Sequence, residues 1–532
     1  MVALLAALLA LSPAELRTKA APGLSAIRPE AIAAHVRFLA DDLLEGRRSG
    51  ERGHAIAERY VAAQFEALGL RPAGERQGWL QEVRLRELRA DPDRSSLSFG
   101  GGPALRPFED YLPGADTDRT EVEIDAPLVF VGYGVRAPEL GYDDTAGVDL
   151  AGKVVVWLQG APGAPFPALA KAVYSDSAVK WLPLAGRGAV GILALLTPER
   201  LQIQPFDRAA HAARRGTVVS SEAPPMPPVV AVQPDIADAL LAHAGSGLSD
   251  QLERAREGKL RAFDVGVRAR IRLASAAREI TSHNVLGLLP ATGVGGKEIV
   301  VISAHLDHLG IGDPVDGDAI YNGAVDNATG IAEMLEMARA LAAQPDRKRA
   351  VLFLAATGEE LGLHGSAWFT RHPTVPLQDV VANLNLDQLA PMWTPHDVVL
   401  RGAEQSTLED HVRVAAALLG LSISPDPVPE QTFFLRSDQY NFARRGIPAA
   451  CLWQGFRDDR GGSTNEAIFR RWRATRYHQP SDDLRQPLDW SAAAAWARFE
   501  FLVALSLVQA DARPTWKPDD FFTKFLTSHR PP

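Results

Sequence analysis

Residues 303–330 read SAHLDHLGIGDPVDGDAIYNGAVDNATG, and the interpretation of the whole chain depends on this stretch. The apolar run that precedes it has the character of a buried strand. His305 and Asp307 follow at the end of that strand, two positions apart, so they share one face. A loop rich in glycine and aspartate then leads to Asp326, and apolar residues at helical spacing predict a helix over residues 329–342. Because open α/β sheets place their sites where a strand ends before a helix, the stretch predicts a metal centre, with a solvated acidic turn as the alternative.

The bulk composition is typical of a soluble globular protein with more than one domain. The chain has 532 residues, of which 46% are hydrophobic, and this length favours two or three domains. Its formal net charge of −9 provides no basic surface for nucleic acid. The single cysteine, Cys451, excludes a disulfide framework within the chain and is expected to be a small buried hydrophobic residue.

The N-terminus begins with the apolar segment MVALLAALLALS, which is too short to span a membrane. Ser12-Pro13-Ala14 offers small residues of the kind that a signal peptidase reads, although no Lys or Arg precedes Arg17. We expect residues 1–20 to be a signal peptide or an uncleaved apolar N-terminus, which favours a periplasmic or secreted protein. Membrane association is expected only through an uncleaved N-terminus. A second apolar segment, residues 491–508, is interrupted by charged residues and predicts a buried core helix.

From residue 280 onward, strand-like and helical patterns alternate as they do in a βαβ sheet. Strands are predicted at residues 284–289, 298–304, 350–355, 380–386, 398–400 and 448–453. Helices are predicted at residues 329–342, 363–371, 407–419 and 491–508. The alternation predicts an α/β domain over residues 280–510, with a mixed, mostly parallel sheet flanked by helices. Residues 28–118 are expected to contribute an N-terminal part that includes two helices within residues 29–69, and residues 511–532 form a C-terminal tail.

Residues 121–278 have a different texture, with short β-like runs between connections rich in glycine and proline. These runs are residues 128–131, 154–158, 190–195 and 229–232, and residues 236–243 predict one short helix. The pattern indicates a smaller, independent module, either α/β or mostly β, inserted into the chain. Because it contains no cluster of histidine and acidic residues, we expect no chemistry there.

Five segments place ligand-type residues where strands end or helices begin. They contain His305 with Asp307, Asp326, Glu359 with Glu360, Asp387, and Tyr477 with His478. Three of the five follow strongly apolar runs, where a carboxylate needs a partner or a metal ion. The clearest case is Asp387, which follows the run VVANLNL.

Two imidazoles and three carboxylates within these segments suit zinc or another borderline divalent ion. Five ligands exceed the three protein ligands that a single catalytic zinc uses. Two ions that share one bridging carboxylate would account for all five, with three ligands for each ion. Such co-catalytic ions lie roughly 3.5–4 Å apart and leave room for a water or hydroxide between them.

Five motifs, in this order, carry a specific family resemblance. They are HLD at 305–307, AVDNATG at 324–330, GEELGLHGS at 358–366, NLD at 385–387 and YH at 477–478. Through them the chain resembles the di-zinc exo-aminopeptidases, a metallopeptidase family whose relatives include glutamate carboxypeptidase II, the transferrin receptor ectodomain and the glutaminyl cyclases. The resemblance covers nearly all of residues 28–510 and implies the zinc-peptidase fold. Residues 37–53 resemble the opening of bacterial members, and residues 121–278 resemble the protease-associated domain that many of them carry, which implies a smaller, β-rich insertion.

The resemblance implies a ligand set for two Zn²⁺ ions per chain. Asp326 would bridge the two ions. His305 and Asp387 would complete one site, and Glu360 and His478 would complete the other.

The resemblance also implies the catalytic residues. Glu359 would be the general base, taking a proton from the bridging water and passing it to the leaving amine. Asp307 would hold the second ring nitrogen of His305, and Tyr477 would donate to the tetrahedral oxyanion. The implied reaction is the attack of metal-activated water on a peptide carbonyl, with peptides that have a free N-terminus as substrates.

The sequence departs from the family pattern after Arg436-Ser437-Asp438, where relatives commonly have His and this chain has Gln439. Gln439 is expected in the core or at the rim of the pocket, and His308 is expected to be a loop or rim residue rather than a sixth ligand. Alternatives within catalysis are a single-zinc acyltransferase like the glutaminyl cyclases and a carboxypeptidase-like enzyme, which would need arginines such as Arg436 or Arg460 at a terminal carboxylate. A non-catalytic, receptor-like member is the alternative from another class, and the presence of every ligand and of the base argues against it.

Overall fold

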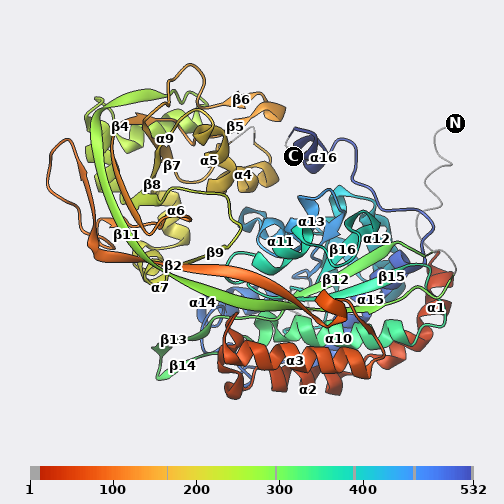
Figure 1. The fold of residues 1–532 in the computed structure, drawn as a ribbon. Coiled ribbons are helices and arrows are strands. Elements are labelled where there is room, and N and C mark those ends of the chain that lie inside the picture. The colour runs from red at the N-terminus through yellow and green to blue at the C-terminus, as the bar shows by residue number, and fades with distance from the viewer. Residues whose placement is uncertain (1–11, 164–165, 294–295, 388–390, 459–462, 529–532) are drawn as a thin grey trace, which may run out of the picture. The chain divides into compact units, whose positions relative to one another are not determined.

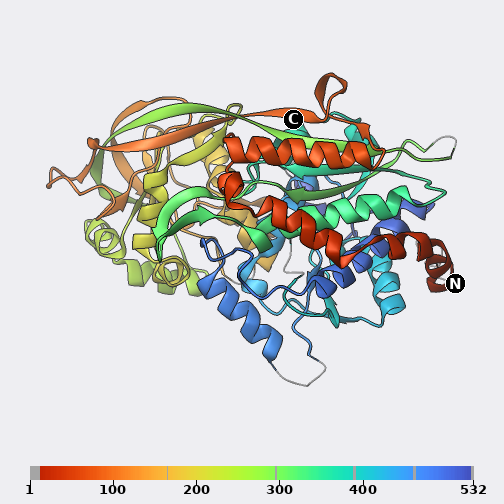
Figure 2. The ribbon, with the colours of Figure 1, turned by 90° about the horizontal axis from the view of Figure 1, so that it is seen from below.

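The computed structural model describes residues 12–163, 166–293, 296–387, 391–458 and 463–528. It contains two compact units, one formed by Met1–Val83 with Thr281–Pro532 and the other by Arg84–Ile280 (Figures 1 and 2). The chain enters the second unit within the long strand β2 (Leu80–Phe99) and leaves it within the long strand β11 (Phe263–Leu289). Residues 1–11 of the predicted N-terminal segment and Arg460 lie outside the described residues.

The first unit is built on a mixed, mostly parallel sheet, which confirms the predicted fold class. Its strands follow the order β19 (Ala449–Ala450), β16 (Val380–Asn385), β12 (Ile299–His305), β15 (Ala350–Ala356) and β11. The first four strands are parallel, and β15 pairs antiparallel with β11. The short strand β1 (Arg71–Pro72) pairs antiparallel with β11. The four parallel strands are buried along their whole length, which explains their largely apolar character in the sequence.

Helices cover both faces of this sheet, as Figure 1 shows. On one side lie α2 (Pro29–Leu39), α3 (Arg52–Ala67) and α10 (Thr329–Ala342), and on the other lie α11 (His364–Arg371) and α13 (Gln439–Ala443). Helix α10 packs against α1 (Pro13–Ala26) and α15 (Trp490–Gln509), and α12 (Leu408–Leu419) packs against α15. Alternate residues of β12, namely Val300, Ile302 and Ala304, join the apolar core shared with α10. His305 has the opposite parity, so the side chain at the end of β12 belongs to the other face.

Helix α15 confirms the predicted buried core helix. Among the described residues it is the one helix long and apolar enough to cross a membrane, and 83% of its apolar window is buried inside the structure. Arg498 donates to the backbone oxygens of Leu24 and Ile27, so the charge within the apolar run is used for packing against the N-terminal segment. Helix α1 contributes Leu16 and Ala20 to the same core, which places part of the predicted segment 1–20 inside the first unit.

The second unit has two apolar cores. Its strands β4 (Glu121–Phe130), β7 (Val154–Leu158), β8 (Gly191–Leu195) and β10 (Val229–Val232) are parallel, and β3 (Tyr111–Leu112) pairs antiparallel with β10. The predicted runs fall on these four parallel strands, and the predicted short helix falls on α8 (Pro234–Ala242). Further helices are α4 (Ala168–Ser175), α5 (Ser177–Ala185), α6 (Pro198–Ile203), α7 (Phe206–Arg215) and α9 (Leu248–Arg256).

The second unit begins at Arg84, whereas the sequence placed its start at residue 121. The reason is β2, which pairs with β9 (Thr217–Ser220) through residues 85–88 and so ties the preceding segment to this unit. The end of the unit at Ile280 lies two residues from the expected 278.

Candidate metal centre

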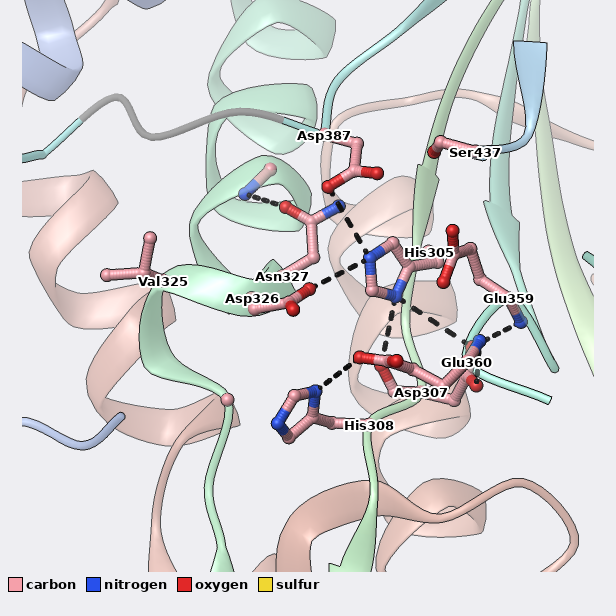
Figure 3. A network of polar contacts seen from close by, with 12 residues as sticks. His305, Asp307, His308, Val325, Asp326, Asn327, Glu359, Glu360, Asp387 and Ser437 are labelled. Carbon is pink, nitrogen blue, oxygen red and sulfur yellow. Dashed lines mark hydrogen bonds and ion pairs between the residues drawn. The ribbon is translucent and has the colours of Figure 1, made fainter. Parts of the chain in front are cut away.

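The site lies where three neighbouring parallel strands of the first unit end. Strand β12 ends at His305, Glu359 and Glu360 follow β15, and Asp387 follows β16. Because the carboxyl ends of parallel strands meet at one edge of a sheet, these side chains come together in Figure 3. Asp326 joins them from the irregular turn Ala324–Ala328 that precedes α10.

The last predicted ligand, His478, follows helix α14 (Thr464–Thr475). Its backbone has a φ of 58°, in the left-handed region that residues other than glycine seldom adopt. Such conformations persist where the surrounding structure enforces them, often at functional sites. The structure therefore brings all five predicted ligands into one cluster.

Asp326 stands at the centre of this cluster, because each of its oxygens faces a different imidazole. Oδ1 lies 3.2 Å from His305 Nε2, and Oδ2 lies 3.3 Å from His478 Nε2. The second carboxylate at each imidazole completes the pattern: Asp387 Oδ1 lies 3.7 Å from His305 Nε2, and Glu360 Oε2 lies 3.0 Å from His478 Nε2. Two sets of three donors therefore share one carboxylate.

The protonation state of His305 indicates what kind of group the two sets of donor atoms can bind. Its Nδ1 lies 3.1 Å from the backbone oxygen of Asp307, and a carbonyl oxygen only accepts, so Nδ1 carries the proton. In the neutral ring Nε2 then presents a lone pair to the carboxylates of Asp326 and Asp387. Lone pairs facing one another are favourable only when a cation or a proton lies between them.

The spacing of the donors fits ions of the size of zinc. Nitrogen and oxygen ligands lie about 2.0–2.2 Å from Zn²⁺ in tetrahedral sites, so two ligands of one ion lie roughly 3.4 Å apart. The four nitrogen-to-oxygen distances in the cluster are 3.2, 3.7, 3.3 and 3.0 Å. Donor atoms of His305, Asp326 and Glu360 lie within 4.8 Å of one another, as do those of His305, Glu359 and Asp387. The donor set therefore fits divalent metal ions.

Electrostatic shifts follow from this crowding of buried charges. Burial lowers the pKa of His305, but Glu359, Asp326 and Asp387 outweigh it and raise this pKa well above its usual value. Burial raises the pKa of Asp326, but its contacts with the two imidazoles outweigh it and hold this pKa well below its usual value. The cluster is thus arranged to keep the Asp326 carboxylate ionised, as a bridging ligand must be.

Comparison with known proteins adds the family. Residues 284–503, which include every residue of the cluster, match the family model of Peptidase family M28. These residues form an M28 peptidase domain. The aminopeptidase YwaD of Bacillus subtilis (strain 168) is 34% identical over 114 residues, a match that spans 21% of this chain and only 23% of that protein.

Two solved structures extend the comparison to most of the chain. An aminopeptidase from Aneurinibacillus sp. strain AM-1 is 19% identical, covers 94% of this chain and 99% of its own, and has a TM-score of 0.53. The zinc aminopeptidase BSAP from Bacillus subtilis is 18% identical, covers 94% of this chain and 98% of its own, and has a TM-score of 0.45. The first of these similarities shows a shared fold.

Asp307 contacts the M28 cluster differently from the expectation. Its Oδ1 lies 4.0 Å from His305 Nδ1, which is too far for a hydrogen bond, and its backbone oxygen contacts that nitrogen instead. The carboxylate is occupied elsewhere: its oxygens accept the backbone N–H groups of Glu359 and Glu360 at 3.2 and 3.4 Å. Asp307 therefore orients the two glutamates as well as the histidine.

His308 is buried in the M28 domain rather than exposed at a rim, contrary to the expectation. Its Nδ1 lies 2.7 Å from Glu360 Oε1, while Glu360 Oε2 faces His478. His308 thus fixes the orientation of one predicted ligand without facing the bridging carboxylate, which agrees with its exclusion as a sixth ligand. Gln439 is also buried, accepting from Asn385 and donating to the backbone oxygen of Phe434.

Backbone contacts around the bridging residue come from outside the predicted set. Asp482 accepts the backbone N–H of Val325 at 3.1 Å and that of Asp326 at 3.0 Å. Asn327 donates to the backbone oxygen of Leu386 at 2.8 Å, which ties the bridging turn to the residue before Asp387. The sequence shows that Asp482 is an acidic residue four positions after His478. It does not show that Asp482 accepts hydrogen bonds from the backbone of Val325 and Asp326.

Arg47 is a further residue that the sequence did not single out. Its guanidinium is 1% exposed and donates to the backbone oxygens of Leu39, Leu306, Asn322 and Gly323. Three of these carbonyls, those of Leu306, Asn322 and Gly323, belong to the segments that carry His305 and Asp326. Burial lowers the pKa of Arg47 to about 10, so the side chain stays charged at neutral pH. The N-terminal loop of charges and glycines thus holds the backbone of the segments that carry these two ligands.

The remaining predicted residues line one cavity with the cluster. Glu359 and Tyr477 both border a cavity of about 60 Å³ beside Asp326 and Asp387. The ring of Tyr477 stacks on that of His478, with centroids 3.8 Å apart and an angle of 21° between the planes. Every predicted site residue therefore lies in or against a single site.

Proposed function

We propose that the chain is a zinc-dependent exopeptidase, most simply an aminopeptidase that releases N-terminal residues from peptides. Membership of the M28 family supports peptide substrates, and the aminopeptidases similar to this chain support N-terminal cleavage. The observation that carries the proposal is the position of Asp326, with one oxygen 3.2 Å from His305 and the other 3.3 Å from His478. One carboxylate between two sets of donors is what a co-catalytic pair of ions requires.

In this proposal five residues hold two Zn²⁺ ions. His305, Asp326 and Asp387 hold one, and Asp326, Glu360 and His478 hold the other. Bound zinc ions polarise a carbonyl and lower the pKa of a bound water to about 7. His308, Asp307 and Asp482 keep the ligands oriented through the contacts described above.

Glu359 is proposed as the general base. Burial raises its pKa well above the usual value, the carboxylates of Asp387 and Glu360 raise it further, and His305 opposes them. A carboxylate with a raised pKa is a better proton acceptor, so it can take a proton from water and pass it to the leaving amine. Glu359 borders the cavity, and its carboxylate lies within 4.8 Å of donor atoms of His305 and Asp387.

Tyr477 is proposed as the donor to the oxyanion. Burial raises the pKa of its hydroxyl well above the usual value, and the nearby carboxylates of Asp326 and Glu360 raise it further. The hydroxyl therefore stays protonated across the neutral range and can donate a hydrogen bond to a developing negative charge.

Two further parts of the proposal concern the rest of the chain. The apolar segment within residues 1–20 supports export to the periplasm or the medium. The VGYGV and GKVVV segments at residues 131–135 and 152–156 support a protease-associated domain in the second unit.

The substitution Glu359→Gln tests the proposed function. We expect the zinc-loaded wild type to carry two zinc ions per chain and to hydrolyse aminoacyl-p-nitroanilides. Glu359→Gln should keep both ions and lose hydrolysis by about a hundred-fold or more, since general base catalysis contributes roughly 10²–10⁴-fold. Glu66→Gln, an exposed glutamate on α3, is the matched control. A wild type that holds two zinc ions but shows no hydrolysis contradicts the peptidase, and a fully active Glu359→Gln contradicts the base.

A further inference from the structure

The cavity beside the cluster has an unusual combination of walls. On the cluster side it is bordered by the carboxylates of Asp326, Glu359, Glu360 and Asp387. Aromatic rings form much of the remaining wall: Phe433, Trp453, Phe469, Trp472 and Tyr477. Two arginines, Arg436 and Arg473, complete the lining. An aromatic pocket alone would suit an apolar side chain of a substrate. The presence of Arg436 and Arg473 in its lining indicates that the cavity also binds a charged or polar group.

The guanidinium groups of Arg436 and Arg473 contact aromatic rings rather than carboxylates. The guanidinium carbon of Arg473 lies 4.7 Å from the ring centroid of Tyr477 and 5.2 Å from that of Phe433, and its Nη2 lies 3.3 Å from Gln431 Oε1. The guanidinium carbon of Arg436 lies 5.4 Å from the Phe433 centroid. Within the described parts of the chain, neither arginine forms an ion pair. Arg473 is half-buried and Arg436 is exposed to solvent, and neither charge is compensated by an ion-pair partner among the described residues.

A third arginine, which contacts the wall residues Trp453 and Phe433 but does not line the cavity, shows the contrast. Arg401 lies 3.6 Å from the centroid of Trp453 and is 3% exposed, but it also forms a two-pronged ion pair with Asp426 at 2.8 and 3.0 Å. Its charge is thus neutralised within the fold, and it supports the wall as a structural element. Arg436 and Arg473 border the cavity and lack such a partner.

The charge balance of the zinc-loaded site supports this difference between Arg401 and the two arginines that line the cavity. Three ligand carboxylates and Glu359 carry four negative charges, which two Zn²⁺ ions balance, while the two imidazoles are neutral ligands. With the metals bound, the cluster therefore no longer offsets the two arginine charges. Burial already lowers the pKa of Arg473, which reflects the cost of holding this cation away from water. An anionic group in the cavity would remove that cost.

We propose that this cavity binds a carboxylate of the substrate through Arg436 and Arg473. This inference rests on the proposed function and names its substrate class: short peptides that present a carboxylate near the scissile bond. The carboxylate comes from an acidic N-terminal side chain or from the free C-terminus of a dipeptide. The planar guanidinium groups suit it because arginine donates two parallel hydrogen bonds to a carboxylate. A cavity of about 60 Å³ has the right size, since one water needs roughly 10–15 Å³ and the cavity therefore accepts about four to six small groups.

Binding to an inactive, zinc-loaded protein tests the proposal without relying on turnover. Glu359→Gln with its zinc content verified is titrated with peptides while its tryptophan fluorescence is followed, because Trp453 and Trp472 border the cavity. Glu-Ala-amide against Gln-Ala-amide isolates a side-chain carboxylate, and Leu-Ala against Leu-Ala-amide isolates a terminal one. We expect the charged member of one pair to bind about ten- to a hundred-fold more tightly, as for hydrogen bonds to a charged group. Equal affinities within both pairs would overturn the proposal.

Arginine variants identify the residues responsible. In the same background, Arg436→Gln together with Arg473→Gln should bring the preferred pair to equal affinity while the neutral member binds as before. Arg470→Gln is the matched control, because Arg470 precedes Arg473 on α14 and pairs with Glu466 at the surface. A double variant that keeps the preference would overturn the assignment, as would a control that loses it. Zinc content and melting temperature confirm that each variant is folded.

Failure of this inference can be told apart from failure of the proposed function. Hydrolysis of neutral aminoacyl-p-nitroanilides that depends on Glu359, together with equal peptide affinities, would leave the peptidase standing and remove the carboxylate pocket. A carboxylate preference in binding without hydrolysis by the wild type would retain the pocket and remove the peptidase.

Discussion

Replacing Arg47 with methionine should destabilise the first unit and weaken its hold on metal. The side chain is 1% exposed and donates to four backbone carbonyls, those of Leu39, Leu306, Asn322 and Gly323. Each hydrogen bond to a charged group contributes roughly 1.5–3 kcal/mol, and each carbonyl left without a donor costs about 1–3 kcal/mol. These contributions are not additive, and removing a buried cation offsets part of the loss, so we expect a net loss of about 3–5 kcal/mol, as measured for broken buried charge networks.

Calorimetry of the zinc-loaded full chain measures the first effect. A loss of this size should lower the melting temperature of the first unit by roughly 6–20 °C, given about 2–4 °C per kcal/mol for domains of 150–250 residues. Chelator competition measures the second effect, because Leu306 and Gly323 adjoin the segments of His305 and Asp326. We expect a 10–100-fold weaker metal affinity, as when groups that orient ligands are removed.

The exposed Arg59 on α3 provides the control for this experiment. Arg59→Met should leave both the melting temperature and the metal affinity at wild-type values. An Arg47→Met protein that melts within about 1 °C of the wild type and binds zinc equally well would refute the role assigned to Arg47.

Other substitutions test the supports of the ligands and the second unit. Asp482→Asn should lower metal affinity about 10–100-fold, because Asp482 accepts the backbone N–H of Asp326, and unchanged chelator competition would contradict this. His308→Phe should weaken metal binding at Glu360, which it contacts at 2.7 Å, so metal analysis after mild chelation should find about one ion per chain; two retained ions would exclude this role. Burial lowers the pKa of Lys180 from 10.5 to about 7, so unfolding takes up a proton between these values and the stability of the second unit rises with pH there. Lys180→Met should flatten this rise in calorimetric scans between pH 7 and 10, and identical slopes would show that the buried lysine is not its origin.

Much of the first unit could be predicted because its strands are buried on both faces. Strands β12, β15 and β16 are buried and consist mostly of apolar residues, and the carboxylates that follow them stand out for that reason. The five ligands were found from this contrast and from the family motifs. The great length of β2 and β11 could not be predicted, since both strands alternate charged and apolar residues over part of their length and pair with strands far away in the sequence.

The supporting contacts could not be predicted from the sequence, because they join distant parts of the chain through side chain and backbone. Arg47 and the carbonyl of Leu306 are 259 positions apart, and no local pattern connects them. The carboxylate of Asp307 was assigned to its neighbour His305, whereas in the structure it accepts from the backbone of Glu359, 52 positions away. Local spacing predicts which residues share a strand face, but not which buried donors need an acceptor.

The central claim is that Asp326 bridges two metal ions, and anomalous diffraction from zinc-loaded crystals tests it most directly. The account predicts two zinc peaks per chain. One would lie within about 2.0–2.2 Å of ligand atoms of His305, Asp326 and Asp387, and the other at the same distance from Asp326, Glu360 and His478. A single peak, or two peaks of which only one contacts Asp326, would contradict the account.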